Sequence, residues 1–285
     1  MASRTTLRGI ALVSVSTVIW GMGGLFTRLL PFDLWTIIFW RGVFATIFVG
    51  VYAYWRFGRG LPARIAGAGG AGGLVALAVF GTIVLFPAAF QLTTVAKAFM
   101  ILSALPFVTA LVAWLWLREV PSGLTLLAGL VAAGGVFIMV GPSSGGLQTG
   151  DLLAVAGTLT QSVATVAIRR NPQVTMLPMI WVAQVLSVAA GAVLGQQLGA
   201  LSARDYAVAA GFGLGPMTLG IVAYVAGSAL IPASLTALIG IAEGPIGGIW
   251  AWVGVGERPD GPTLIGGAVV LAAVVGRILL GRPKD

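Results

Sequence analysis

Residues 95–124 read VAKAFMILSALPFVTALVAWLWLREVPSGL, and they are the most informative part of the sequence for the fold. It belongs to an apolar run over 94–117 that contains one charged side chain, Lys97, and ends in a turn at residues 118–121. About 20 mainly apolar residues are enough to cross a bilayer as a helix. The charges and the proline of the turn end this helix before the next apolar run begins at Gly123. The stretch therefore predicts two membrane-spanning helices joined by a very short connector.

The rest of the chain repeats this pattern. Of its 285 residues, 58% are hydrophobic and 8% are charged, and the mean hydropathy is +1.03. Soluble globular proteins carry about 25% charged residues, and disordered chains have few apolar ones. We therefore expect an all-α polytopic membrane protein with ten transmembrane helices. The runs that predict these helices are 8–29, 33–55, 70–91, 94–117, 123–141, 151–170, 175–197, 205–228, 232–255 and 261–281.

The composition also excludes several kinds of chemistry. The chain has no cysteine and no histidine, so thiol nucleophiles, disulfides, zinc sites and histidine acid–base catalysis are absent. Its eight acidic residues are scattered and predict no metal site. The glycine-rich segment 69–73 lacks the Lys-Ser/Thr pair of a phosphate loop, and segment 213–216 lacks the strand and acidic residue of a dinucleotide site. We expect no cofactor and no ATP-driven transport by this chain alone.

The basic residues predict an orientation. The 16 Lys and Arg residues stand singly between apolar runs, so a nucleic-acid partner is not expected. With a cytoplasmic N-terminus, most of them fall on the cytoplasmic side, as the positive-inside rule requires. Ten helices then place both termini in the cytoplasm. This arrangement predicts a multi-pass protein of the bacterial inner (plasma) membrane.

The two halves of the chain resemble each other. Glu119, Pro121 and Gly123 match Glu257, Pro259 and Gly261 at one constant offset, and at a slightly different offset Arg28 matches Arg169 and Trp40 matches Trp181. We therefore expect one repeat over 1–141 and a second over 142–285. Because each repeat has an odd number of helices, the second must enter the membrane from the opposite side. Such inverted repeats are typical of transporters that bind substrate near the midplane.

The stretch 90–140 resembles the EamA unit of the drug/metabolite transporter superfamily. The likeness rests on a proline in the fourth helix, a closing Glu-x-Pro turn and a glycine-rich fifth helix, and residues 250–276 carry the same unit in weaker form. The resemblance covers almost the whole chain and implies ten helices, two inverted five-helix units and metabolite export by alternating access. Within the superfamily the chain looks similar to the YddG-type exporters of aromatic amino acids.

Three charged residues within the apolar runs are candidates for substrate or proton binding. At 1.5 Å per residue, Arg41 lies about 12 Å below one surface and Glu243 about 16 Å above the other, so both approach the midplane of a core about 30 Å thick. Arg41 or Lys97 would contact a substrate carboxylate, and Glu243, in a segment interrupted by glycine and proline, would bind an amino group or a proton. The alternatives are a structural Arg41–Glu243 pair, and for Lys97 extension of its amine to the membrane surface.

Uncharged residues at membrane depth extend this set of candidates. An aromatic-lined cavity would suit large apolar substrates, and polar amides could orient a substrate group. Trp20 is the leading aromatic candidate, because Gly21, Gly23 and Gly24 follow it and would leave space beside it. For each of these side chains, packing or interhelical hydrogen bonding is the alternative. The further candidates are Trp40, Trp181, Phe80, Phe86, Tyr224, Gln161 and Gln184.

These observations predict a secondary exporter of small metabolites, amino acids in particular, and not an enzyme. Its expected partners are a small-molecule substrate and membrane lipids, and it would act as a monomer or homodimer. A nucleotide-sugar or drug carrier is the alternative among transporters, although a nucleotide sugar would favour more basic residues in the cavity. A membrane-embedded lipid-modifying enzyme would need grouped acids, histidine or a metal site. A receptor or scaffold would leave the inverted repeat unexplained.

Overall fold

A computed structural model describes residues 4–141, 146–172, 174–199, 201–231 and 233–280. Within these residues every regular element is a helix. The elements are α1 (Arg4–Leu29), α2 (Leu34–Phe57), η1 (Gly58–Gly60), α3 (Leu61–Gly67), α4 (Gly69–Leu92), α5 (Val95–Leu102), α6 (Leu105–Leu117), α7 (Gly123–Val140), α8 (Thr149–Arg170), α9 (Met176–Leu194), α10 (Ala203–Leu214), the π-helical segment η3 (Gly215–Leu219), α11 (Gly220–Ser228), α12 (Ala233–Gly240), α13 (Glu243–Val255) and α14 (Gly261–Leu280).

The helices begin and end where the sequence provides caps and prolines. Asp33 accepts hydrogen bonds from two backbone N–H groups at the start of α2, and Thr94 and Ser122 cap α5 and α7 in the same way. Such side chains satisfy backbone donors that have no partner within the helix. Pro106 stands in the first turn of α6, where its missing N–H costs nothing. The short connectors therefore follow from local sequence.

In the part of the chain that the structure describes, seven helices are long and apolar enough to cross a membrane by length and composition, and the bent pair α5–α6 would be an eighth. The protein is thus a multi-pass membrane protein. Each predicted apolar run coincides with one helix or with consecutive helices, apart from residues 232 and 281, which lie outside the described residues. The structure differs at residues 58–67, where the expected connector forms η1 and the short helix α3.

Three of the apolar runs are not continuous α-helices. Run 94–117 bends by 43° between α5 and α6, and run 232–255 breaks between α12 and α13. The second break confirms the interruption predicted from the Gly240–Pro245 segment. The third run contains η3, whose π-helical turn follows Gly215 and Pro216. Because a π-helical turn or a break frees backbone groups, all three interruptions are places where polar atoms become available inside the bundle.

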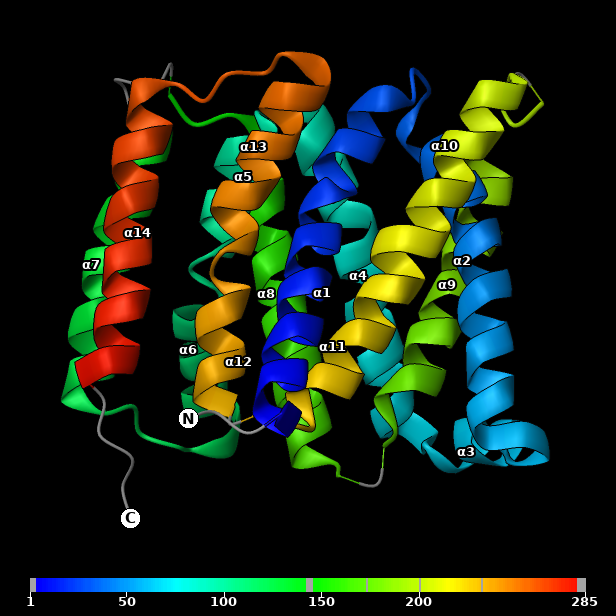
Figure 1. Ribbon diagram of the computed structural model, residues 1–285, viewed down its shortest axis with the longest axis horizontal. Coiled ribbons are helices and arrows are strands. Elements are labelled where there is room, and N and C mark those ends of the chain that lie inside the picture. Colours follow the sequence, from blue (N-terminus) through cyan, green and yellow to red (C-terminus); the bar gives the residue numbers. More distant parts are fainter. Residues whose placement is uncertain (1–3, 142–145, 173, 200, 232, 281–285) are drawn as a thin grey trace.

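The helices stand side by side in one bundle (Figure 1). α1 begins and α14 ends at the same end, at the bottom of Figure 1, which we call the basic end because Arg56, Arg118 and Arg169 also lie at helix ends there. The other end, where α13 finishes next to Glu257, is called the Glu257 end. The principal packing partners are α4 with α8, α7 with α14, α2 with α9, α1 with both α13 and α11, and α5 with α13.

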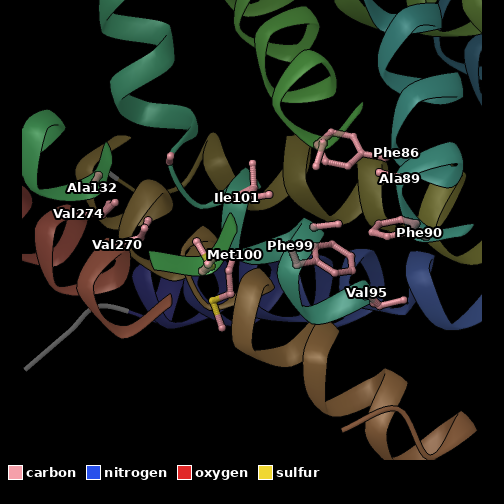
Figure 2. Close-up of a cluster of buried hydrophobic side chains, with 14 of the residues drawn as sticks. Phe86, Ala89, Phe90, Val95, Phe99, Met100, Ile101, Ala132, Val270 and Val274 are labelled. Carbon is pink, nitrogen blue, oxygen red and sulfur yellow. The ribbon is translucent and has the colours of Figure 1, made fainter. Parts of the chain in front are cut away.

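A cluster of buried apolar side chains lies between α4, α5 and the α7–α14 pair (Figure 2). Phe86 and Phe90 of α4 and Phe99 of α5 form its aromatic part, with ring centroids of Phe90 and Phe99 5.0 Å apart. Val270 and Val274 of α14 and Ala132 of α7 complete the other side. This cluster joins α14, from the second half of the chain, to helices of the first half.

α7 and α14 approach each other backbone to backbone. A Cβ atom added to Gly135 would lie 2.7 Å from the carbonyl oxygen of Gly266, and Gly266 faces the Gly135 carbonyl oxygen in return. Only glycine leaves room for such an approach, as in other close-packed membrane helices. The last helix of each predicted half is therefore joined to the last helix of the other half.

Candidate functional site

Arg41 of α2 is buried in the interior of the bundle without a counter-ion. Its side chain is 2% exposed, and among the described residues no carboxylate lies within ion-pair distance of it. Its guanidinium lies over the ring of Phe212, 5.1 Å from the centroid, and Nη2 reaches the Ile83 carbonyl oxygen at 3.4 Å. Nε has no partner. A buried cation held by such weak contacts is costly in a membrane, so it calls for a functional explanation.

Gln184 of α9 meets Arg41 at the π-helical segment. Arg41 Nη1 and Gln184 Nε2 both lie 3.6 Å from the Sδ atom of Met217 in η3. Gln184 is 1% exposed, and its Oε1 atom, like Arg41 Nε, is buried without a hydrogen-bond partner. The structure thus brings two of the predicted residues together around Met217. It leaves one donor, Arg41 Nε, and one acceptor, Gln184 Oε1, without a hydrogen bond among the described residues.

Trp20, Tyr224 and Glu243 form a second group. The rings of Trp20 in α1 and Tyr224 in α11 have centroids 5.1 Å apart. The Glu243 carboxyl group lies within electrostatic reach of the Tyr224 hydroxyl group. Glu243 is half-buried at the first residue of α13, and within the described part of the chain it has no hydrogen bond or ion pair. An acid in the first turn of a helix is stabilised by the helix dipole, which provides the structural alternative to a functional role.

The segment η3 contacts both groups. Its Met217 contacts Arg41 and Gln184, while the carbonyl oxygen of the neighbouring Pro216 accepts a hydrogen bond of 2.9 Å from Trp20 Nε1. Trp20 also lies against Gly220, where an added Cβ atom would come 2.5 Å from Nε1. The interruption of the helix by η3 therefore joins the Arg41 group to the Trp20 group.

The structure does not contain the Arg41–Glu243 pair considered from the sequence. The ion pairs between described residues involve other partners, and neither Arg41 nor Glu243 takes part in one. The space predicted beside Trp20 is also filled, because Gly21 faces Ile246 and Gly24 faces Val95. These glycines allow α1 to pack closely on α13 and α5.

The structure also corrects the expectation that Lys97 extends to the membrane surface. Its side chain does not extend to the membrane surface but is 3% exposed and lies 3.6 Å from the buried carboxylate of Asp151. Thr93 Oγ1 donates to the other oxygen of that carboxylate at 2.7 Å. Since Lys97 already has an acidic partner, it is less suited than Arg41 to bind a substrate carboxylate.

Three aromatic candidates hold helices together. Trp40 donates its indole N–H to the Leu198 carbonyl oxygen, and Trp181 donates to that of Thr46. Phe86 belongs to the buried cluster of Figure 2 and packs on Gly157 of α8. These contacts favour the packing alternative for all three.

Phe80 and Gln161 remain half-buried, and within the described residues their side chains show no ring contact or hydrogen bond.

Sequence reasoning missed Met217 and Phe212, which contact Arg41 directly. The Gly215-Pro216 dipeptide was the available signal, because it marks the interruption that exposes Met217. No sequence pattern marks Phe212 as a cation–π partner, since phenylalanine is common in apolar helices.

Comparison with known proteins agrees with this architecture. The EamA-like transporter family matches residues 7–141. A solved structure described only as the crystal structure of a protein is 19% identical, with a TM-score of 0.62 over 100% of both chains, which shows the fold alone. None of the curated protein sequences compared matches the chain significantly.

The chain therefore carries an EamA-like domain of the drug/metabolite transporter superfamily. Members of this family are transporters and not enzymes. The EamA-like domain and the apolar helices together favour a membrane transporter of small molecules over an enzyme.

Proposed function

We propose that this protein is a secondary transporter of the YddG type that exports amino acids, aromatic ones among them, across the bacterial inner membrane. Substrate would bind around η3, between two inverted five-helix halves at 1–141 and 142–285, and reach each side by alternating access. Both termini would be cytoplasmic, so that the basic end faces the cytoplasm and the Glu257 end faces outward.

The observation that carries this proposal is the pair of unmatched charges at the interior site. Arg41 has no carboxylate partner, and Glu243 has no cationic partner, within the described residues. An amino acid carries one group of each kind. Its carboxylate would complete the coordination of Arg41, including Nε, and its ammonium group would find acceptors in Gln184 Oε1 or Glu243.

The neighbouring aromatic pair supports substrates with large side chains. Trp20 and Tyr224 are half-buried and adjacent, and Trp20 donates a hydrogen bond to Pro216 of η3. Aromatic rings bind apolar or aromatic side chains through both area and favourable edge and face contacts. Phenylalanine and tryptophan are therefore the first substrates to test.

The packing of the helices supports the inverted arrangement. If α1, α2, α4, α5–α6 and α7 correspond in order to α8, α9, α10–α11, α12–α13 and α14, then the contact of α4 with α8 matches that of α1 with α11. Likewise the contact of α1 with α13 matches that of α8 with α6 and α5, and α2 with α10 matches α9 with α4. A two-fold relation between the halves produces matched pairs of this kind.

A nucleotide-sugar carrier fits less well. It would need several cations to bind a diphosphate, whereas among the described residues Arg41 is the cation at η3 and Lys97 is already paired with Asp151. Counterflow of a labelled nucleotide sugar is therefore included as a comparison.

The test is counterflow in proteoliposomes loaded with unlabelled amino acids. Labelled phenylalanine should exchange, while phenethylamine, which lacks the carboxylate, and phenylpropionate, which lacks the amine, should not. Exchange of nucleotide sugars, or of the amine alone, would contradict the proposal. Protein-free liposomes and the Arg41→Gln variant serve as controls.

A further inference from the structure

At the Glu257 end, one acidic residue closes the bundle. Glu257 forms an ion pair with Arg28 of α1 at 2.9 Å and also accepts a hydrogen bond from the backbone N–H of Val95, the first residue of α5. Arg28 in turn donates to the Thr93 carbonyl oxygen at 3.0 Å. Glu257 therefore fastens α1, α5 and the end of α13 together.

Beneath this contact α5 lies directly on α13. The buried face of α13 consists of Gly244, Gly247, Gly248 and Ala251. A Cβ atom on Gly248 would lie 3.3 Å from Cβ of Ala96, and one on Gly247 would lie 2.3 Å from the Phe99 ring. The glycine face lets α5 pack directly on α13, beside a cleft of about 340 Å³ that Ala96, Gly248 and Trp252 help to line.

The basic end carries the matching ion pair in a different setting. Glu119 pairs with Arg169 at 2.8 Å, and in the repeat these two correspond to Glu257 and Arg28. Their side chains are 44% and 61% exposed, against 17% and 30% for Glu257 and Arg28. Within the described chain Glu119 has no partner besides Arg169. No helix start is fastened to it.

The face of α6 that corresponds to the buried face of α13 is only partly covered: Ala113 is buried, and Thr109 donates a hydrogen bond to Ser162 of α8 at 3.1 Å. A cleft of about 330 Å³ lies there, lined by Pro106, Thr109, Ala110 and Ala113 together with Glu119 and Arg169. At the offset that relates Glu119 to Glu257, these four residues correspond one by one to Gly244, Gly247, Gly248 and Ala251. The cleft therefore lies on the face of α6 that matches the face of α13 on which α5 packs, and no described residue of α12 lines it.

We propose that this cleft is the seat of α12, the counterpart of α5, in the opposite state of the transporter. In that state α12 packs on α6, and Glu119 accepts a hydrogen bond from the backbone N–H of Ala233 as Glu257 now does from Val95. Glu257 then releases α5 and the Glu257 end opens. Glu119 and Glu257 are thus alternating latches, an inference that rests on the proposed alternating access.

The breaks in the two helix pairs make this exchange mechanically feasible. α5 and α6 are already bent by 43° at Ser103–Ala104, and α12 and α13 are separate helices around residues 241–242. Each half-helix is thus free to tilt about a short hinge without breaking its own hydrogen bonds. In the described residues α6 and α12 share no contact comparable to that between α5 and α13.

The absence of cysteine from the chain permits a clean test by disulfide trapping. The pair Ala96→Cys with Gly248→Cys reports the present state, since their Cβ atoms would be close to disulfide distance. The matched pair Ala110→Cys with Ser234→Cys reports the proposed state. Oxidation in membranes is quantified by the loss of two maleimide-reactive thiols, with each single-cysteine variant as a control.

Both pairs should form disulfides. Loss of a charged hydrogen bond should change the balance of states, so Glu119→Gln should slow the Ala110–Ser234 disulfide and Glu257→Gln should accelerate it, each by about tenfold. The proposal is overturned if the Ala110–Ser234 disulfide fails to form in the Glu257→Gln background while the Ala96–Gly248 disulfide forms. It is also overturned if neither glutamate variant changes the rates.

Since these measurements require no substrate, they stand apart from the counterflow assay. Trapping without amino-acid exchange would refute the proposed substrate and retain the latches. Exchange without trapping of the Ala110–Ser234 pair would refute the latches and retain the proposed substrate.

Discussion

Lys97 of α5 and Asp151 of α8 form an ion pair of 3.6 Å that connects the two halves of the chain, and neither side chain is more than 3% exposed. Asp151 also accepts from Thr93 Oγ1 and from the backbone N–H of Gln148, where it caps α8. A buried pair of this kind is expensive to break, because the remaining charge is left without compensation.

We expect Lys97→Met to destabilise the protein by about 3–5 kcal/mol, since it leaves the Asp151 carboxylate buried alone. The double variant Lys97→Met with Asp151→Asn should recover most of this loss, because the asparagine keeps the cap and removes the charge. Thermal unfolding in detergent, followed by tryptophan fluorescence, gives the comparison. A double variant less stable than Lys97→Met would show that the unpaired Asp151 charge is not the cause of the lost stability.

Arg41→Gln should weaken amino-acid binding about 10- to 100-fold, the effect expected for loss of a charged hydrogen bond to the carboxylate. The same change should raise Tm slightly, because it removes a buried charge that has no acidic partner among the described residues. Arg41→Lys should restore exchange only in part, since lysine lacks the planar fork. If Arg41→Gln lowers Tm and leaves the substrate KM unchanged, Arg41 is structural.

Glu243→Gln should separate exchange from proton-driven transport. The variant cannot bind and release a proton, so a pH gradient should no longer drive net efflux, while exchange at equal pH on both sides continues. Asp260→Asn is the matched control, because Asp260 caps α14 through the Thr263 N–H outside the interior site. An unchanged response to the pH gradient would remove Glu243 as the proton carrier.

Asp33, at the start of α2, predicts a pH dependence of stability. Burial acts to raise the pKa of its carboxyl group, but hydrogen bonds from the Thr36 side chain and from the backbone N–H groups of Thr36, Gln196 and Trp35 outweigh it and hold the pKa below its usual value of 3.8. The stabilisation is therefore complete well above pH 3.8 and is lost as the pH falls through the lowered value.

Asp33→Asn keeps a capping side chain but removes this charge. Its Tm should lie below that of the wild type at pH 7, and the difference should shrink as the pH is lowered toward 3. Asp33→Ala should cost about 1 kcal/mol in addition at neutral pH, the usual value of a helix cap. A difference between Asp33→Asn and wild type that is constant over this pH range would rule out the carboxylate as its source.

The sequence predicted the positions of the apolar helices well, because proline, glycine and charged turns end a membrane helix locally. It also predicted the interruption before Glu243. It did not predict α3, and although the Gly215-Pro216 dipeptide marks an interruption, the sequence did not show that a π-helical turn forms there. The depth of a side chain follows from counting residues, but the direction in which it points does not.

This difference explains the corrections at the candidate site. Arg41 and Gln184 were selected as polar residues within apolar runs, and both are buried, but their meeting at Met217 is a tertiary contact that no local pattern encodes. For Lys97 the sequence predicted either a substrate contact or extension to the membrane surface; it did not reveal the ion pair, because Asp151 is distant in the chain. Trp40 and Trp181 proved to donate to backbone carbonyl groups of neighbouring segments.

The glycine contact between α7 and α14 has a mechanical consequence. Since the Gly135 and Gly266 backbones touch, any side chain there would push the two helices apart. We therefore call α7 and α14 the rigid pair. The rigid pair consists of one helix from each half of the chain and lies at the side of the bundle (Figure 1). Neither half can turn as an independent block while its last helix is anchored to the other. Movement must therefore be concentrated in the remaining helices, which flex around a fixed frame.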